Sequence, residues 1–175
     1  DNTNRLISVY DDFEKTTKTI TYNNLLYPSS YNNKNITYRG NQVLKIGDVS
    51  FEYDSLGNRV LKNYDGTDTR YYYDGNKLIR QENEDGYIID YIYTNNVLEG
   101  LKYNNEEYYF VRDITGSIEK IIDKNKIVMV VYSYTSYGEV TKNINTSLTG
   151  TRREIAQILL NNNGFVYKGY YYDVE

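Results

Sequence analysis

The ten residues Phe51-Glu52-Tyr53-Asp54-Ser55-Leu56-Gly57-Asn58-Arg59-Val60 contain the motif that organises this chain. Its aromatic-x-Tyr step, at positions 51 and 53, recurs at 71 and 73 and again at 91 and 93, so the step returns every 20 residues. A fixed period of this length indicates one supersecondary unit that is copied along the chain, and such arrays commonly bind, span or enclose other molecules. The motif therefore predicts a repeat architecture.

The composition favours strands. Of the 175 residues 23 are Tyr and only one is Pro, and the chain contains no Cys, His or Trp. Proline makes up about 5% of an average protein, and Tyr is a strong strand former whose apolar ring and polar tip suit a half-buried sheet surface. We therefore predict an all-β fold.

Two Asp-x-x-Gly segments, Asp54–Gly57 and Asp113–Gly116, predict turns between strands. The Asp side chain can accept a hydrogen bond from the backbone two residues on, and Gly can adopt the positive φ that ends a type I turn with a bulge. Short strand-like segments surround these turns, which predicts meandering antiparallel hairpin repeats of about 20 residues in a curved sheet. The apolar run Ile127–Val131 predicts a strand that is covered on both faces.

One short helix is predicted near residues 151–162, packed on the sheet. Thr151 and Glu154 have the spacing of a capping box, and Asn161–Gly164 should end the helix. The apolar residues expected on its packed face are Ile155, Ile158 and Leu159.

The regularity of these patterns divides the chain into three parts. Irregular N-terminal strands occupy residues 1–45, the repeat sheet occupies residues 46–148, and a short helix with a final strand occupies residues 149–175.

Composition and motifs exclude several classes of function. A net charge of −4 leaves no basic stripe for nucleic acid, and no apolar run is long enough for a membrane span. Without His or Cys, the common catalytic triads, thiol sites and His-based metal sites are excluded. The chain has no phosphate-loop or dinucleotide fingerprint, and nothing in the spacing of its carboxylates selects a glycosidase pair. We expect no catalytic residue, no cofactor and no metal ion.

The motifs resemble those of a known family. Tyr53-Asp54-x-x-Gly57-Asn58-Arg59 looks like the YD repeat, and Tyr109–Ile118 followed by Tyr132–Glu139 resembles the core of the Rhs (rearrangement hotspot) proteins. Tyr167–Asp173 is similar to the aromatic segment near the end of that core, so three motifs follow one another in the family's order between about residues 36 and 175. The residues that carry the repeat motif are Tyr53, Asp54, Gly57, Asn58, Arg59, Tyr73, Asp74, Tyr93, Arg112, Asp113, Gly116, Tyr134, Tyr137, Gly138, Gly169, Tyr172 and Asp173.

The resemblance implies a large exported bacterial protein, secreted or held at the cell surface. In that family the strands spiral into a hollow β-shell that encloses a C-terminal, often toxic, polypeptide, and an Asp-Pro motif at the end of the core performs self-cleavage. The only proline here is Pro28, so we expect the self-cleavage motif to lie outside this chain. The expected function is that of a non-enzymatic shell segment, whose partners are the other repeats of the parent chain and an enclosed toxin polypeptide.

Within such a segment, Tyr53, Tyr73 and Tyr93 are expected to form cross-strand ladders. Asp54 and Asp113 are expected to be turn residues, and Arg59 and Arg112 to pair with local carboxylates or stack on tyrosine. Two other functions stay open. The exposed tyrosines and asparagines of a carbohydrate-binding or adhesion module would contact a cell-surface glycan, and a strand-exchange element would associate through its sheet edges.

Overall fold

The computed structural model describes residues 4–11, 15–135, 140–167 and 170–171, and it divides into two compact units. The first unit contains Asp1–Asn76 and Glu82–Gly86, and the second contains Lys77–Gln81 and Tyr87–Glu175. The three parts predicted from the sequence, with boundaries at residues 45 and 148, are defined by how regular the repeats are. The two compact units do not test that division, so it stays a prediction.

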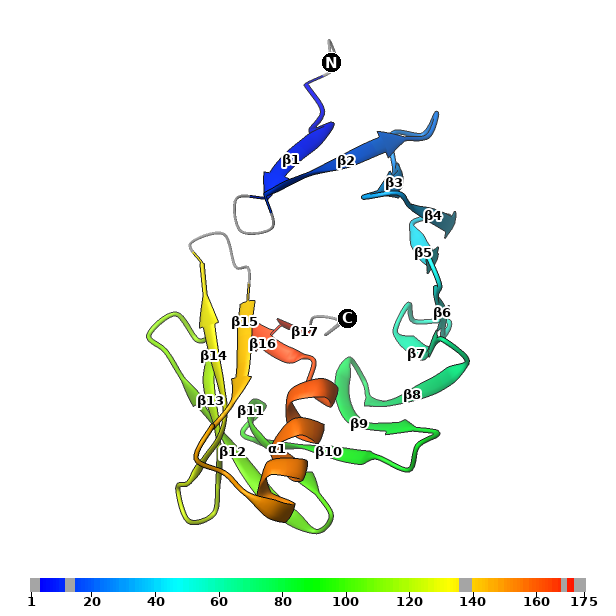
Figure 1. Ribbon diagram of the computed structural model, residues 1–175. Helices are drawn as coiled ribbons and strands as arrows, with labels where there is room; N and C mark the ends of the chain where they lie inside the picture. The colour runs from blue at the N-terminus through cyan, green and yellow to red at the C-terminus, as the bar shows by residue number, and fades with distance from the viewer. Residues whose placement is uncertain (1–3, 12–14, 136–139, 168–169, 172–175) are drawn as a thin grey trace. The chain divides into compact units, whose positions relative to one another are not determined.

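The first unit consists of antiparallel strands that pair in the order of the sequence (Figure 1). The strands are β1 (Ser8–Asp11), β2 (Thr16–Tyr22), β3 (Pro28–Tyr31), β4 (Lys34–Arg39), β5 (Gln42–Ile46), β6 (Val49–Tyr53), β7 (Arg59–Tyr64) and β8 (Thr67–Asp74).

The second unit continues the same pattern and adds a helix. From β10 to β15 each strand pairs antiparallel with the next, and β16 and β17 form a separate two-stranded ribbon. The elements are β9 (Lys77–Asn83, of which Glu82 and Asn83 belong to the first unit), β10 (Ile88–Thr94), β11 (Val97–Tyr103), β12 (Glu106–Arg112), β13 (Ile118–Asp123), β14 (Val128–Tyr134), β15 (Val140–Ile144), α1 (Gly150–Asn162), β16 (Phe165–Tyr167) and β17 (Tyr170–Tyr171). The predictions of an all-β hairpin meander and of one short helix are both confirmed.

Two-residue turns close several of the hairpins. Asn32-Asn33, Asn95-Asn96 and Asn104-Asn105 have positive φ at both positions, as does Asp65-Gly66. Paired positive φ values define the type I′ turn, whose twist matches that of the two strands it joins, and Asn, Asp and Gly tolerate this conformation best. Each of these turns joins two strands that are consecutive in the sequence and pair with each other.

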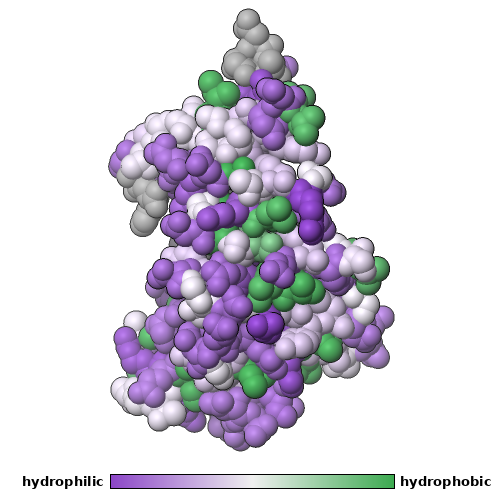
Figure 2. Space-filling model, turned by 90° about the vertical axis from the view of Figure 1, so that its right-hand side faces the viewer, coloured by the Kyte–Doolittle hydropathy of each residue, from purple (hydrophilic) through white to green (hydrophobic). Residues whose placement is uncertain are grey.

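Buried side chains are distributed unequally between the units. Among the described residues of the first unit, Tyr71 is the only buried hydrophobic residue, whereas the second unit buries a core around Ile89, Leu101 and Ile121. Helix α1 packs against β14 and β15 and covers part of that core (Figure 1). On the face shown in Figure 2, apolar side chains form separate groups between polar ones. The first unit is therefore a sheet with little core of its own.

The predicted capping box of the helix is wrong. The helix begins at Gly150, so Thr151 already lies in its first turn, and the N-cap is Thr149, which makes no side-chain cap hydrogen bond. The buried stripe is formed by Ala156, Leu159 and Leu160, while Ile155 and Ile158 are half-buried at its margin. The predicted end is confirmed, since the helix stops at Asn162.

The expectation that β14 is covered on both faces is also wrong. Met129 and Val130 are both buried, but the register passes from Ile122 opposite Val128 to Ile121 opposite Val130, so Met129 is the extra residue of a bulge. One extra residue shifts the in–out alternation by one, which places two consecutive side chains on one face. On the other face the strand is only half-buried, at Val128 and at Val131.

At Gly100 of β11 the backbone of β12 lies so close that there is no room for a side chain. A Cβ at Gly100 would lie 2.2 Å from the carbonyl oxygen of Tyr108, whereas a Cβ at Gly116 would meet nothing within 4 Å. Because Gly116 has φ +87°, Gly116→Ala should lower the free energy of unfolding by about 1–3 kcal/mol through backbone strain alone. We predict a larger loss for Gly100→Ala in chemical denaturation. Equal losses in the two variants would contradict the close approach.

Candidate functional site

One hydrogen bond recurs through both units. The hydroxyl of the last tyrosine on an even-numbered strand donates to a carbonyl at the start of the preceding strand or, for Leu6, two residues before that start. We call this series of contacts the tyrosine ladder. Its hydroxyl-to-carbonyl pairs are Tyr22 with Leu6 at 2.7 Å, Tyr38 with Pro28, Tyr53 with Val43 and Tyr73 with Arg59 at 2.8 Å each, Tyr93 with Leu78 at 3.1 Å, and Tyr134 with Ile118.

On β12 an arginine takes the place of the tyrosine. Arg112 donates from Nη2 to the carbonyl oxygen of Leu98 at 2.8 Å and from Nη1 to that of Gly116 at 2.8 Å. The guanidinium of Arg and the phenol of Tyr each carry a hydrogen-bond donor at the end of a long side chain. The position therefore requires a donor with sufficient reach and not an aromatic ring.

The acceptor carbonyls lie at β-bulges. Where the register is defined, each acceptor residue stands opposite the previous donor, and the alignment shifts by one residue there. The pairs are Tyr22 with Pro28, Tyr38 with Val43, Tyr53 with Arg59, Tyr93 with Leu98, and Arg112 with Ile118. A bulge disrupts the backbone ladder, and a buried carbonyl without a partner is unfavourable. The next donor along the chain supplies that partner, so each bulge links two consecutive repeats.

The turn that begins at Asp54 lies next to one of these bulges, where Tyr53 stands opposite Arg59. Asp54 Oδ1 accepts hydrogen bonds from the backbone N–H groups of Leu56 at 2.8 Å and Asn58 at 2.9 Å, and Gly57 has φ +87°. Partial burial alone would raise the Asp54 pKa, but hydrogen bonds from the side chain and backbone of Asn58 and from the Leu56 and Gly57 backbone together lower it. The carboxylate thus organises the turn, in agreement with the role predicted for it.

The turn at Asp113 has the same geometry. Its Oδ1 accepts from the backbone N–H groups of Thr115 at 2.8 Å and Ser117 at 3.0 Å, and Gly116 has φ +87°. The Thr115 hydroxyl, which donates to the same oxygen at 2.7 Å, makes the largest contribution to lowering the Asp113 pKa.

Two further turns have this geometry although their sequences do not match the Asp-x-x-Gly motif. Asn23 accepts from the backbone N–H groups of Leu25 and Tyr27, and Asp123 accepts from those of Asn125 and Ile127. Their fourth residues, with positive φ, are Leu26 and Lys126 in place of glycine. An Asn or Asp at the end of a strand, either as its last residue or directly after it, would have been the better signal.

The remaining predicted motif residues have varied surroundings. The Arg59 guanidinium lies 4.6 Å from the ring centre of Phe51 and 5.9 Å from that of Tyr71, so it contacts a tyrosine ring as expected but lies nearer to a phenylalanine. Asn58 donates to Asp54 Oδ2 at 3.1 Å, and Asp74 is the exposed last residue of β8. Five residues of the predicted set lie outside the described residues, namely Tyr137, Gly138, Gly169, Tyr172 and Asp173.

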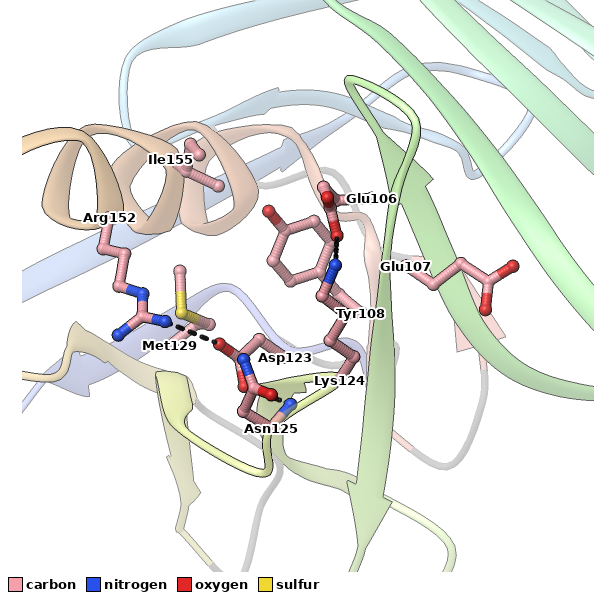
Figure 3. A pocket seen from close by; sticks show the side chains of 9 residues that line it. All are labelled: Glu106, Glu107, Tyr108, Asp123, Lys124, Asn125, Met129, Arg152 and Ile155. Atoms are coloured by element: carbon pink, nitrogen blue, oxygen red, sulfur yellow. Dashed lines mark hydrogen bonds and ion pairs between the residues drawn. The ribbon is translucent and has the colours of Figure 1, made fainter.

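A pocket of about 210 Å³ lies in the second unit between the first turn of α1 and two hairpin tips (Figure 3). Its lining residues are Glu106, Glu107, Tyr108, Asp123, Lys124, Asn125, Met129, Arg152 and Ile155. Four of the charged side chains in this lining form two ion pairs.

Two ion pairs cross this pocket. Lys124 Nζ lies 2.7 Å from Glu106 Oε2, and Arg152 Nη2 lies 3.7 Å from Asp123 Oδ2. The hydrogen bond that Lys124 donates to Glu106 raises the Lys124 pKa above its ordinary value of 10.5. The Arg152 pair fastens the start of α1 to the β13–β14 turn. Within the described residues, no group of three or more acidic side chains is placed to hold a metal ion, and no helix is long and apolar enough to span a membrane.

Known proteins resemble this chain in sequence and in fold. No family model matches it. It is 28% identical over 131 residues to the tRNA3(Ser)-specific nuclease WapA of Bacillus spizizenii and 28% identical over 138 residues to the tRNA nuclease WapA of Bacillus subtilis. Each match covers 73% of this chain and 5% of the relative, so the chain spans a small part of the length of these proteins.

Among solved structures, a chain in the crystal structure of TcdB2-TccC3-Cdc42 has a similar fold. The TM-score is 0.50 with 13% sequence identity, and the match covers 90% of this chain and 8% of the other. The likeness extends over nearly the whole meander and concerns the fold alone.

Tyr73 and its neighbour Tyr72 provide a matched test of the tyrosine ladder. Tyr73 donates to the part-buried carbonyl of Arg59, whereas Tyr72 points to the other face and donates to Glu82 in an exposed contact. Tyr73→Phe leaves the carbonyl without this donor, so we predict a loss of about 1–3 kcal/mol in the free energy of unfolding. Tyr72→Phe should change it by less than about 0.5 kcal/mol. Similar losses in denaturant titrations of the two variants would contradict a structural role for the ladder.

The same tyrosine predicts how stability depends on pH. Burial raises the pKa of Tyr73 from its ordinary value of 10.0 to about 12, and burial also raises the pKa values of Tyr93 and Tyr134. An unfolded tyrosine loses its proton first, so the stabilisation is complete below about pH 10 and is lost as pH rises through the folded pKa. We expect denaturation midpoints to fall between pH 10 and 12, and to fall less in Tyr73→Phe than in Tyr72→Phe. Identical pH profiles would show that Tyr73 does not titrate as its burial requires.

Proposed function

We propose that this chain is a structural segment of an exported bacterial toxin-delivery protein of the Rhs/YD type, and that its strands form part of a β-wall around a C-terminal toxin polypeptide. The tyrosine ladder carries the proposal, because it repeats one locking contact from hairpin to hairpin through both units. The similarity to the WapA proteins, which are named as tRNA nucleases, supports it.

The physical character of the first unit fits a wall. A sheet that buries one large hydrophobic residue cannot depend on a conventional core, and it must take its order from backbone pairing and from contacts between repeats. The ladder supplies such contacts at every even-numbered strand of this unit, from Tyr22 to Tyr73. A single-layer sheet held by such contacts can expose one face to a lumen and the other to solvent, which a wall between the two requires.

In this proposal the segment itself is not an enzyme. The chain spans 5% of the WapA nucleases, and we assign the toxic activity of its parent protein to a different part of that protein. The two motif carboxylates that sequence analysis singled out, Asp54 and Asp113, are engaged in turns, and the pocket carboxylates Glu106 and Asp123 lie in ion pairs. The proposed location is outside the producing cell or at its surface, and the proposed partners are the other repeats of the parent chain and the enclosed polypeptide.

Enclosure is tested on the full-length parent protein purified from its producer. Its mass is measured as an intact particle and again after denaturation, and the particle is digested with a protease before and after unfolding. We expect one particle that separates into fragments on denaturation, with a C-terminal fragment that resists the protease only in the native particle. A single uncleaved polypeptide whose C-terminal part is digested under native conditions would overturn enclosure.

A carbohydrate-binding module is the second candidate, favoured by exposed tyrosines on the strands. Tyr72 and Tyr109 are 42% and 38% exposed, and each donates its hydroxyl to a glutamate. Binding to a glycan array that is lost in Tyr72→Ala or Tyr109→Ala, with unchanged unfolding midpoints, would favour this module. Variants that bind as the unmodified chain does would remove it.

A further inference from the structure

The two faces of the sheet differ in their side chains. Successive residues of a strand point to opposite faces, so Val49 and Phe51 of β6 lie on the same face as the donor Tyr53. Ser50 and Glu52 lie on the other face. We call the face that carries the donors the ladder face, and the opposite one the reverse face.

The register carries this assignment from strand to strand, because directly opposed residues of an antiparallel pair share a face. Val49 stands opposite Ile46 of β5 and Tyr64 of β7, which places all three on the ladder face. Phe51 stands opposite Lys62 of β7, which lies there too. The ladder face of the first unit therefore extends over neighbouring strands.

In the second unit the chain itself covers the ladder face. Tyr91 and Tyr132 each stand two residues before a donor and so lie on this face. They are 6% and 1% exposed, because α1 packs against β14 and the Phe165 ring of β16 meets the Tyr91 ring edge-on, with 4.8 Å between the ring centres. Asn163, directly after α1, donates to the Tyr132 hydroxyl at 3.4 Å. The ladder face is thus a surface on which polypeptide packs.

The described residues of the first unit place no such layer on its ladder face. All the elements of that unit are strands that pair side by side in one sheet. Ile36 and Phe51, each two residues before a donor, are only half-buried, and Tyr64 is 44% exposed. An apolar surface is left here that a second layer of polypeptide would bury, as α1 and β16 do in the second unit.

Charge is also divided between the faces of β4 to β8, all of which the structure describes. The carboxylates of these strands all lie on the reverse face, namely Glu52, Asp68 and Asp74. Asp68, for example, accepts a hydrogen bond from Asn63 at 2.7 Å. The cations on the ladder face of these strands are Lys34, Arg59 and Lys62. Charges across an interface are arranged with complementary sign, so the ladder face suits a partner that supplies carboxylates.

We infer that the ladder face of β4 to β8 is the lumen side of the proposed wall, and that the enclosed polypeptide lies on it through apolar and acidic side chains. The inference rests on the proposed function, because it takes the enclosed polypeptide as the occupant. The apolar side chains of the occupant pack against Ile36, Phe51 and Tyr64, and its carboxylates lie within reach of the exposed Lys34. The reverse face is in contact with solvent.

Two tyrosines of nearly equal exposure test which face is enclosed. Tyr64 on the ladder face and Tyr72 on the reverse face are 44% and 42% exposed, so replacing either should change stability little. Each is changed to Cys in the full-length parent protein, and the native particle is treated with a maleimide carried on a polymer too large to enter it. We expect labelling of Tyr72→Cys in the native particle and of Tyr64→Cys only after denaturation, read from the mass of the peptide that contains the substitution.

Equal labelling of the two positions in the native particle, or labelling of Tyr64→Cys alone, would overturn the inference. These results also separate it from the proposed function. If only Tyr64→Cys reacts, the wall still encloses its cargo but has the reverse face inward. If both positions react, enclosure fails as well.

Two lysines on neighbouring strands test the acidic contact in the unmodified parent. Lys34 of β4 lies on the ladder face and Lys45 of β5, opposite Thr37 and Ser50, on the reverse face, and both are exposed. A water-soluble carbodiimide activates a carboxylate, the lysine amine displaces the activating group, and an amide and a urea are formed. We expect amide crosslinks from Lys34 to Asp or Glu residues of the C-terminal polypeptide, and none from Lys45. Crosslinks from both lysines alike, or from neither, would overturn the acidic contact.

Discussion

The hydrogen bond from a side-chain donor to a bulge carbonyl is the constraint on which the fold depends. A bulge locally breaks the exchange of backbone hydrogen bonds, and by itself it would let a strand slip in register. A side chain of the next hairpin supplies the missing donor at the bulge, as Tyr73 does for the Arg59 carbonyl. Three consecutive strands are thereby fixed at one point, and the same point recurs with each repeat.

The two units use this constraint in different settings. In the first unit it acts on a sheet with little buried apolar surface, so side-chain hydrogen bonds and turn geometry carry much of the order. In the second unit α1 adds a packed layer. Gln81, itself buried, donates to the carbonyl of Asn162 at the end of the helix, while the exposed Arg152 pairs with the half-buried Asp123 at its beginning. The helix is thus tied to the sheet at both ends by contacts of different strength.

Local signals in the sequence predicted the parts of the structure that are themselves local. Tyr content and the Asp-x-x-Gly turns predicted the meander, since propensity and turn chemistry act within a few residues. The acceptors of the tyrosine hydroxyls could not be predicted, because they depend on the register between strands. The turns at Asn23 and Asp123 have the same form as the Asp-x-x-Gly turns, but the motif does not identify that form because Leu26 and Lys126 stand where glycine is expected. The bulge at Met129, which places two consecutive buried side chains on one face of β14, could not be read from the apolar run, and Arg112 shows that the donor position is not restricted to tyrosine.

Pairing in the order of the sequence also determines how such a sheet responds to force. Within each unit a strand is held by the hairpins next to it in the chain, and no described strand crosses over another. Tension applied at one end of such a meander loads a few hydrogen bonds at a time and peels the outermost strand, whereas a sheet with long crossovers must shear many bonds together. The donor of each hairpin then sets the size of one step. Extraction through a narrow pore would proceed as a series of small, similar events.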